Sequence, residues 1–155
     1  MLERRTFGGG ALTSAGDNDV FVAKLDSSGK HVWSKRFGDA AALRPTSIAA
    51  NAAGTVVVAG EFDGAIDFGL GPLAGSGGAP GWDGFVVSLD AAGAAHWSRG
   101  FGNADVNSGK LLTDTAGEVA IDASGAVWLS ARSTGRSTSD PGPSPRRATP
   151  RTRWW

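Results

Sequence analysis

The chain has two histidines, His31 and His96, and these are the first candidates for acid–base chemistry. Histidine is the side chain that most readily exchanges a proton near neutral pH. A Ser-His-Asp triad needs a serine nucleophile beside one of them, and no segment matches the Gly-x-Ser-x-Gly elbow that exposes such a serine. We therefore expect both histidines to be surface residues, and we predict no catalytic residue.

Five aspartates recur near the ends of apolar segments: Asp17, Asp19, Asp63, Asp67 and Asp83. Oxygen ligands gathered in a loop bind Ca²⁺, but no segment matches the Asp-x-Asp-x-Asp-Gly loop with its distal Glu. Asp63 and Asp67 also have the residue types of a glycosidase acid and nucleophile. Turn capping and solvation account for all five residues, so we predict no metal site.

Two segments are rich in glycine, "GGG" at Gly8–Gly10 and "GPLAGSGGAPG" at Gly71–Gly81. A phosphate-binding loop would continue into Lys-Ser/Thr and a helix, and neither segment does so. We interpret both as flexible connections between strands and predict no cofactor. The chain has no cysteine, which excludes disulfides and thiolate metal sites.

Tryptophans are the large apolar anchors of this sequence. Trp33 and Trp97 occupy matching positions in two similar segments, so we predict that they pack in the core. Trp82 falls in an expected loop and Trp128 stands where the matching segment has Val57, which makes these two the candidates for contact with a ligand.

The segments that carry these residues occur twice. "FVAKLDSSGKHVWSKRFGD", which starts at Phe21, matches "FVVSLDAAGAAHWSRGFGN", which starts at Phe85. "SIAANAAGTVVVAG", which starts at Ser47, matches "EVAIDASGAVWLSA", which starts at Glu118. The shorter "FGGGAL" from Phe7 matches "FGLGPL" from Phe68. Matches this far apart indicate a repeated supersecondary unit rather than a heptad or a collagen triplet.

Each unit contains a turn signal in duplicate, in which Asp or Asn is followed by two small residues and then Gly. The copies are Asp26–Gly29, Asn51–Gly54, Asp90–Gly93 and Asp122–Gly125. Asp or Asn can hydrogen-bond the backbone two residues later, and Gly accepts the left-handed conformation that closes a hairpin. Asp114–Gly117 is a fifth match, which we interpret as a loop turn.

Apolar β-formers flank the four turns and predict eight strands. These are Val20–Leu25, His31–Phe37, Ser47–Asn51, Thr55–Phe62, Phe85–Leu89, Ala95–Phe101, Val119–Ile121 and Ala126–Ser130. Four antiparallel strands per unit, repeated in tandem, are typical of β-propeller blades. The predicted fold class is therefore all-β, a propeller fragment of about two blades; a β-solenoid and a two-sheet sandwich are the alternatives.

The segments "DVFVAKLDSSGKHVWSKRFGD" and "SIAANAAGTVVVAGEFDGAIDFG" resemble the bacterial SBBP-type β-propeller repeat over Phe7 to Ala131. That resemblance implies a propeller from a secreted or cell-surface protein, without a shared catalytic set. Asp-x-x-Gly-x-x-x-Trp, at Asp26 to Trp33 and at Asp90 to Trp97, is similar to the docking motif of quinoprotein-like blades. This second resemblance implies that Trp packs between blades, and it implies no quinone cofactor here.

We assign residues 1–131 to a β-propeller repeat region, with an incomplete blade at 7–37, a blade at 47–101 and a partial blade at 119–131. Residues 132–155 are expected to be a disordered, basic, Pro/Arg-rich tail. About two blades cannot close a propeller, so we expect the remaining blades to belong to a larger parent protein. Alone, the chain is expected to be marginal, to aggregate or to assemble with copies of itself.

The tail also has a specific alternative origin. When its codons are read in a shifted frame, Ser133 to Ser144 can encode the residues of Phe62 to Leu73 except Leu70. This match continues the register in which Glu118–Ala131 matches Ser47–Gly60. We hypothesise a frameshift near Ala131, which resequencing of the DNA would test. A functional basic tail is the other interpretation.

Charge and hydropathy exclude several classes of function. Residues before Arg132 carry nine basic and fourteen acidic side chains, a net of −5, which gives no reason to expect nucleic acid as a partner. We find no signal peptide and no membrane span, so a cell-surface location follows only from the resemblance.

The function predicted from the sequence is a non-enzymatic scaffold that binds a protein or a glycan. Two alternatives stay open, a fragment of a propeller-fold carbohydrate-active enzyme and a pseudogene product without activity.

Overall fold

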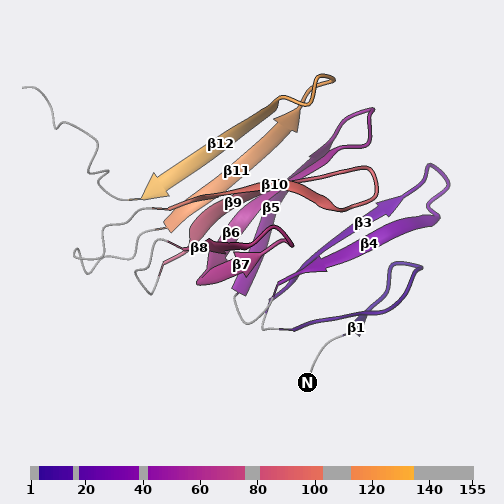
Figure 1. The fold of residues 1–155 in the computed structure, drawn as a ribbon, viewed down its shortest axis with the longest axis horizontal. Coiled ribbons are helices and arrows are strands. Elements are labelled where there is room, and N and C mark those ends of the chain that lie inside the picture. Colours follow the sequence, from indigo (N-terminus) through magenta and orange to yellow (C-terminus); the bar gives the residue numbers. More distant parts are fainter. Residues whose placement is uncertain (1–3, 16–17, 39–41, 76–80, 103–112, 135–155) are drawn as a thin grey trace, which may run out of the picture.

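The computed structural model describes residues 4–15, 18–38, 42–75, 81–102 and 113–134 of the 155-residue chain. These residues form twelve β-strands and no helix (Figure 1). The prediction of an all-β chain built from antiparallel sheets is therefore confirmed.

The strands, in chain order, are β1 (Arg4–Arg5), β2 (Leu12–Thr13), β3 (Val20–Leu25), β4 (His31–Phe37), β5 (Ala42–Ala50), β6 (Val56–Asp63), β7 (Ala65–Asp67), β8 (Pro72–Ala74), β9 (Asp83–Leu89), β10 (Ala95–Phe101), β11 (Thr113–Ile121) and β12 (Val127–Thr134). All eight strands expected from the apolar segments are present, and three of them have the predicted bounds. The four strands that we did not expect, β1, β2, β7 and β8, are two or three residues long. Segments this short carry no readable alternation of apolar and polar residues.

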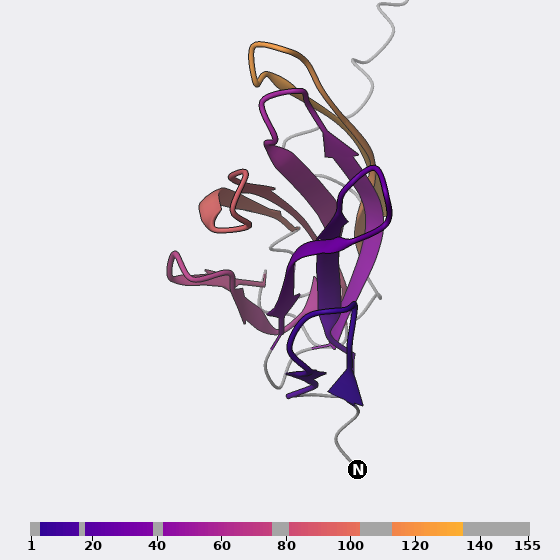
Figure 2. The same cartoon turned by 90° about the vertical axis from the view of Figure 1, so that its right-hand side faces the viewer.

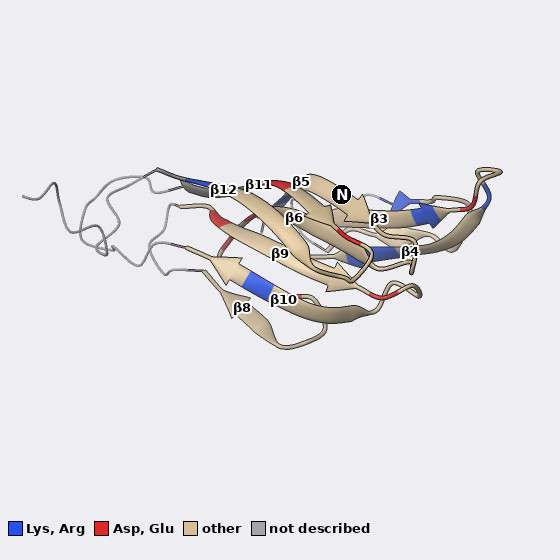
Figure 3. Cartoon of the chain, turned by 90° about the horizontal axis from the view of Figure 1, so that it is seen from above, with Lys and Arg blue, Asp and Glu red and all other residues tan. Residues whose placement is uncertain are grey.

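The centre of the structure is a four-stranded antiparallel sheet in the order β10-β9-β6-β5. Its inner strands, β6 and β9, pair from Val56 with Leu89 to Phe62 with Asp83. The β7–β8 hairpin is inserted between them in the chain and forms a sheet of its own. Most of the central sheet carries neither acidic nor basic residues (Figure 3), as expected for strands covered on both faces.

Two further hairpins flank this sheet, β3–β4 and β11–β12 (Figure 1). Val20 pairs with Phe37 in the first hairpin, and their counterparts Gly84 and Phe101 pair with each other in the central sheet. The bulge that skips Val32 in β4 recurs at the matching His96 in β10. The matched segments therefore have the same strand register.

The β11–β12 hairpin has the register of β5–β6. Val119 faces Leu129 just as their counterparts, Ile48 and Val58, face each other. Both β5 and β11 contain a bulge at matching places, after Pro45 and after Ala116. A bulge adds a residue to one strand and bends it without ending it.

Apolar side chains cover both faces of the central sheet. On one face, Val56 and Val58 join a buried cluster with Val20 and Val22 of β3. Because side chains alternate along a strand, Val57 points to the opposite face, against which β11 lies. Val57 is fully buried there, and Figure 2 shows β11–β12 running alongside β5–β6. The central sheet is thus enclosed between one hairpin from each flanking segment.

The four predicted hairpin turns are confirmed. In each, the Gly amide donates to the carbonyl of the Asp or Asn three residues earlier, at 2.9–3.1 Å. The four glycines have φ between +80° and +89°, the left-handed region that other residues rarely adopt. These turns join β3 to β4, β5 to β6, β9 to β10 and β11 to β12.

Several sequence predictions were wrong. Asp114–Gly117 is not a loop turn but lies within β11, where Asp114, Thr115 and Ala116 pair with β12 and the bulge follows Ala116. Gly71–Gly81 is not simply a flexible connection, because Pro72–Ala74 forms β8. The expected tail boundary at residue 132 is also misplaced, since β12 continues to Thr134 by pairing with β11. The rest of that tail and the predicted frameshift copy from residue 135 onward lie outside the described residues.

Candidate functional site

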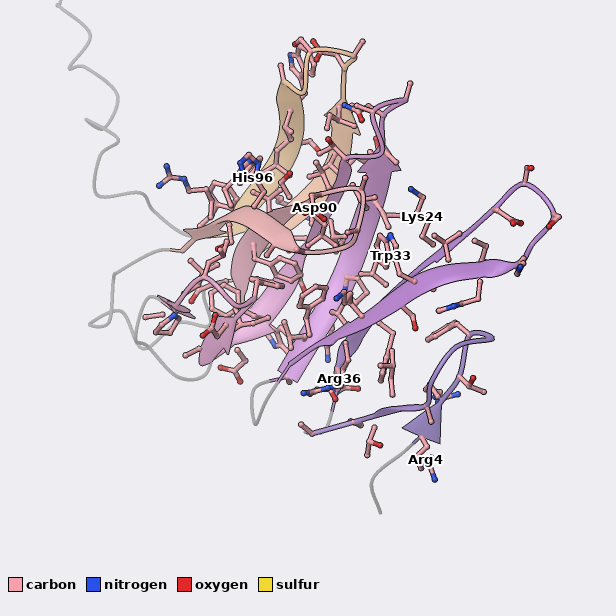
Figure 4. All side chains as sticks on the ribbon, turned by 45° about the vertical axis from the view of Figure 1, so that its right-hand side comes forward. Arg4, Lys24, Trp33, Arg36, Asp90 and His96 are labelled. Carbon is pink, nitrogen blue, oxygen red and sulfur yellow. The ribbon has the colours of Figure 1, made fainter. Side chains whose placement is uncertain are left out.

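Trp33 joins the β3–β4 hairpin to the central sheet. Its indole Nε1 donates a hydrogen bond of 2.9 Å to the carbonyl of Ala91, in the β9–β10 turn (Figure 4). Its ring lies against Gly93, where an added Cβ would be 3.0 Å from the ring. Gly93 thus has two roles: its positive φ closes the turn, and its lack of a side chain leaves room for the Trp33 ring. Trp33 is half-buried and packs against the main core, as the sequence predicted.

A second set of contacts joins β5 to β11. Thr46 Oγ1 donates to the carbonyl of Ala116 at 2.6 Å, and Asn51 Nδ2 donates to the carbonyl of Asp122 at 3.1 Å. Ser47 Oγ accepts a hydrogen bond of 3.2 Å from the amide of Val119. These bonds connect residues 70 to 72 positions apart, which is the spacing of the matched segments. Equivalent parts of neighbouring segments therefore lie side by side.

A groove of about 430 Å³ opens between the β3–β4 hairpin and the β5–β6 hairpin. Its walls include Val22, Leu25, Trp33, Ile48 and Val56. Leu25 is 51% exposed and Ile48 is 59% exposed, so the groove presents unusually accessible apolar side chains. Polar contributions come from Lys24 and from Asn51, whose amide is already bonded to Asp122 and Thr55.

A second groove of about 430 Å³ lies between the β7–β8 turn and β10. It is lined by Leu70–Leu73 on one side and by His96–Arg99 on the other. Trp97 is in this wall and is only half-buried. Trp97 was predicted to pack in the core like Trp33, but in the described structure it is not among the side chains that pack against the core cluster.

The two histidines lie on different hairpins, His31 on β4 and His96 on β10. His96 is exposed, as predicted. His31 is half-buried under the β1–β2 loop, where its ring would collide with a Cβ at Gly9, and its Nε2 lies 3.1 Å from Ser34 Oγ. No carboxylate of the described chain bonds to His31, so a serine and a histidine meet here without the acid of a triad.

The recurring aspartates divide into two groups. Asp67 caps a turn as predicted, since its Oδ1 accepts bonds from the amides of Gly69, Leu70 and Gly71 at 2.7–3.1 Å. For Asp19 and Asp83 the predicted solvation was wrong, because both side chains are buried, although Asp19 still accepts a bond from the backbone amide of Ala15. Asp19 directly precedes β3, and Asp83 is the first residue of β9.

The carboxylate of Asp19 is held from two sides. Its Oδ2 accepts a 2.6 Å bond from the amide of Ala15 and lies 3.5 Å from Arg36 Nη1. Its Oδ1 is buried without a hydrogen-bond partner among the described residues, and it faces the Cα of Gly38, where a Cβ would collide with it. An acid that recurs directly before an apolar strand, with arginine near the end of the partner strand, was the sequence signal that we missed.

The exposed acids of three turns are stabilised as carboxylates. The Ser28 hydroxyl, followed by the backbone amides of Lys30 and Ser28, lowers the pKa of Asp26 below its usual 3.8. The backbone amide of Ala94 has the largest effect in lowering the pKa of Asp90. Asp122 has a lowered pKa for the same kind of reason, with the Ser124 hydroxyl as the main cause.

The two tryptophans singled out for ligand contact have different surroundings. Trp82 is partly covered by the guanidinium of Arg44, whose Cζ is 4.1 Å from the ring centroid. Trp128 is 58% exposed, although the matching Val57 is fully buried. Ligand contact by either residue stays a prediction. Asp17 lies outside the described residues, and Asp63 is a half-buried residue at the end of β6.

In the described part of the chain, no group of three or more His, Asp or Glu side chains is placed to hold a metal ion. The same residues contain no helix long and apolar enough to cross a membrane. No protein-family model matches the sequence, and no curated protein matches it either.

Proposed function

We propose that this chain is a segment of a β-propeller that works as a non-enzymatic scaffold for a protein or glycan ligand. The resemblance to SBBP-type repeats suggests that the parent protein is secreted or displayed on a bacterial surface. The central sheet would be one blade, β3–β4 the outer half of the preceding blade, and β11–β12 the inner half of the following one.

One observation carries the proposal: neighbouring matched segments contact each other through equivalent residues. Asn51 donates a hydrogen bond to the carbonyl of Asp122, its own counterpart in the following segment. Thr46 likewise donates to the carbonyl of its counterpart, Gly117. Such a head-to-tail contact relates each unit to the next by one repeated operation. Tandem four-stranded units joined in this way build propellers.

The apolar content of the units supports a scaffold role. The inner strands of the central sheet are covered on both faces by neighbouring units, as Val57 is covered by β11, so their large side chains serve packing between units. The exposed parts of the described chain include the hairpin turns and the side chain of Trp128, which is 58% exposed. Exposed indole rings provide flat apolar surfaces for contact with a partner.

The proposal can be tested by separating binding from turnover. The purified chain would be titrated calorimetrically with a panel of neutral and acidic polysaccharides, and the mixtures analysed by mass spectrometry. We expect any glycan that binds to be recovered intact. New reducing ends or unsaturated sugars would contradict the non-enzymatic assignment if His96→Ala abolishes them while the exposed control Lys30→Ala does not.

A further inference from the structure

We infer that this chain associates head to tail with a second copy of itself, by pairing β12 of one copy with β3 of the other. The partner is identified by the register of the chain's own sheets. The inference rests on the strand pairing and the side-chain contacts within one copy. It needs no ligand, so it is independent of the proposed binding function.

Both strands have an unpaired edge. Among the described residues, β12 pairs only with β11, and β3 pairs only with β4. In the repeat, β12 matches β6 and β3 matches β9, and β6 and β9 pair with each other along seven positions. An unpaired strand edge is a template for a second chain.

The register of the new ladder follows from the internal one. Val56 faces Leu89 in the central sheet, so Val127 of one copy should face Leu25 of the other. At the other end Glu61 faces Gly84, which places Arg132 opposite Val20. The result is a four-stranded sheet in the order β11-β12-β3-β4, completed by two copies.

The same pairing of copies would give Trp97 the kind of contact that its counterpart Trp33 makes within one copy, against the turn of the neighbouring unit. Trp33 docks on Ala91 and Gly93, whose counterparts are Ser27 and Gly29. An added Cβ at Gly29 would meet nothing within 4 Å, so the β3–β4 turn has open space beside it. We therefore expect Trp97 of one copy to donate its indole N–H to the Ser27 carbonyl of the next copy.

An aromatic pair gives a third, independent match. Phe37 and Phe68 have ring centroids 5.4 Å apart, and their counterparts are Phe101 and Phe7. Phe101 is 38% exposed and Phe7 is 37% exposed, so both rings have accessible apolar surface. Association would bring these rings together across the copies.

The apolar groove beside β3 would receive the indole of Trp128. In the central sheet, the matching Val57 is covered by the next unit and is fully buried, whereas Trp128 is 58% exposed. When β12 lies along β3, its Trp128 faces the groove between β3 and β5–β6, which is lined by Ile48 and Val56. The groove and the tryptophan thus cover each other's apolar surface.

The interface uses different surfaces on the two copies, so it generates a ring or an open chain of copies. Each copy contributes one complete sheet and two half-sheets, which makes two sheets per copy. Propellers close with about four to eight blades, so a closed ring would contain about two to four copies.

The test uses the full chain, which has no native cysteine. Ala23 and Leu129 should face each other across the new ladder, so Ala23→Cys/Leu129→Cys is expected to form disulfides between copies under mild oxidation. The control Lys24→Cys/Leu129→Cys shifts one position, which turns the two thiols to opposite faces of the sheet and should not crosslink.

Sedimentation velocity of the unmodified chain provides the second readout. We expect discrete oligomers, and Trp97→Ala should raise the dissociation constant by about tenfold or more without changing the thermal midpoint of the dissociated chain. Trp33→Ala, in contrast, should lower that midpoint. A chain that is monomeric at every concentration, a disulfide formed only within one chain, or equal crosslinking of the control pair would each overturn the inference.

Discussion

The aspartates of this chain have two different roles, which depend on whether the carboxylate is exposed or buried. Asp26, Asp90 and Asp122 lie in solvent and organise turns through their own oxygens. Asp19 lies inside, against Arg36 and a backbone amide. The first kind was predictable because the turn is local, while the second depends on a partner on the next strand, across the hairpin.

The turn acids make stability depend on pH. Because their folded pKa values are below the ordinary 3.8, their contribution is present above that value and is lost as the pH falls through the lowered pKa. We expect Asp90→Asn to fold normally, since Asn51 makes the same turn, and to lose less stability between pH 6 and pH 3 than the parent chain. Urea midpoints at the two pH values measure this. An unchanged acid dependence would show that the Asp90 carboxylate contributes nothing.

The Asp19–Arg36 pair gives a second prediction at this scale. Arg36→Met should cost about 1–3 kcal/mol, because it leaves a buried carboxylate with one hydrogen bond fewer. Arg99→Met, at an exposed position of β10, should stay within about 0.5 kcal/mol. Urea unfolding measures both variants, and equal losses would contradict the assigned role of Arg36.

At the level of elements, the hairpin turn is the unit that the sequence specifies best. An Asp or Asn caps each turn, a glycine closes it, and apolar residues extend on both sides. The ends of the strands were less predictable. Pairing with a neighbouring strand makes β5, β11 and β12 longer than their own residue patterns indicate. The bulges leave Thr46 and Gly117 unpaired within these ladders, and pairing resumes after them.

Two turn glycines form a matched pair for testing the contact between elements. Gly93→Ala should lose about 1 kcal/mol from its positive φ and a further amount from collision with Trp33. Gly125→Ala has the same strain, but its Cβ would meet nothing within 4 Å. We therefore expect Gly93→Ala to be the more destabilising by thermal unfolding. Equal midpoints would mean that the indole does not pack on the turn.

Across the whole molecule, stability should decrease from the central sheet outward. The inner strands β6 and β9 are covered on both faces, whereas β12 pairs on one edge only within the described chain and has exposed side chains. In tandem-repeat chains, each unit is stabilised mainly by its nearest neighbours.

Hydrogen exchange can test this gradient in the Trp97→Ala variant, at a concentration low enough to keep that variant dissociated. We expect the amides of Val57 and Ala59 to exchange more than about tenfold more slowly than those of Trp128 and Ser130. In the assembled parent chain, β12 and β3 should gain protection together. Uniform exchange in the variant would contradict a graded structure.

The sequence by itself determined the strand class, the four turns and the spacing of the matched segments, because each depends on residues within a few positions of one another. Only the tertiary structure decided that Trp33 bonds to the Ala91 carbonyl while Trp97 has no such partner among the described residues, that Asp19 and Asp83 are buried, and that β11 lies against β5. These are contacts between distant segments, so they depend on which faces remain uncovered once the sheets have formed. Two tryptophans with nearly identical local sequence therefore have different surroundings, because the neighbour that covers Trp33 has no counterpart over Trp97 in the described chain.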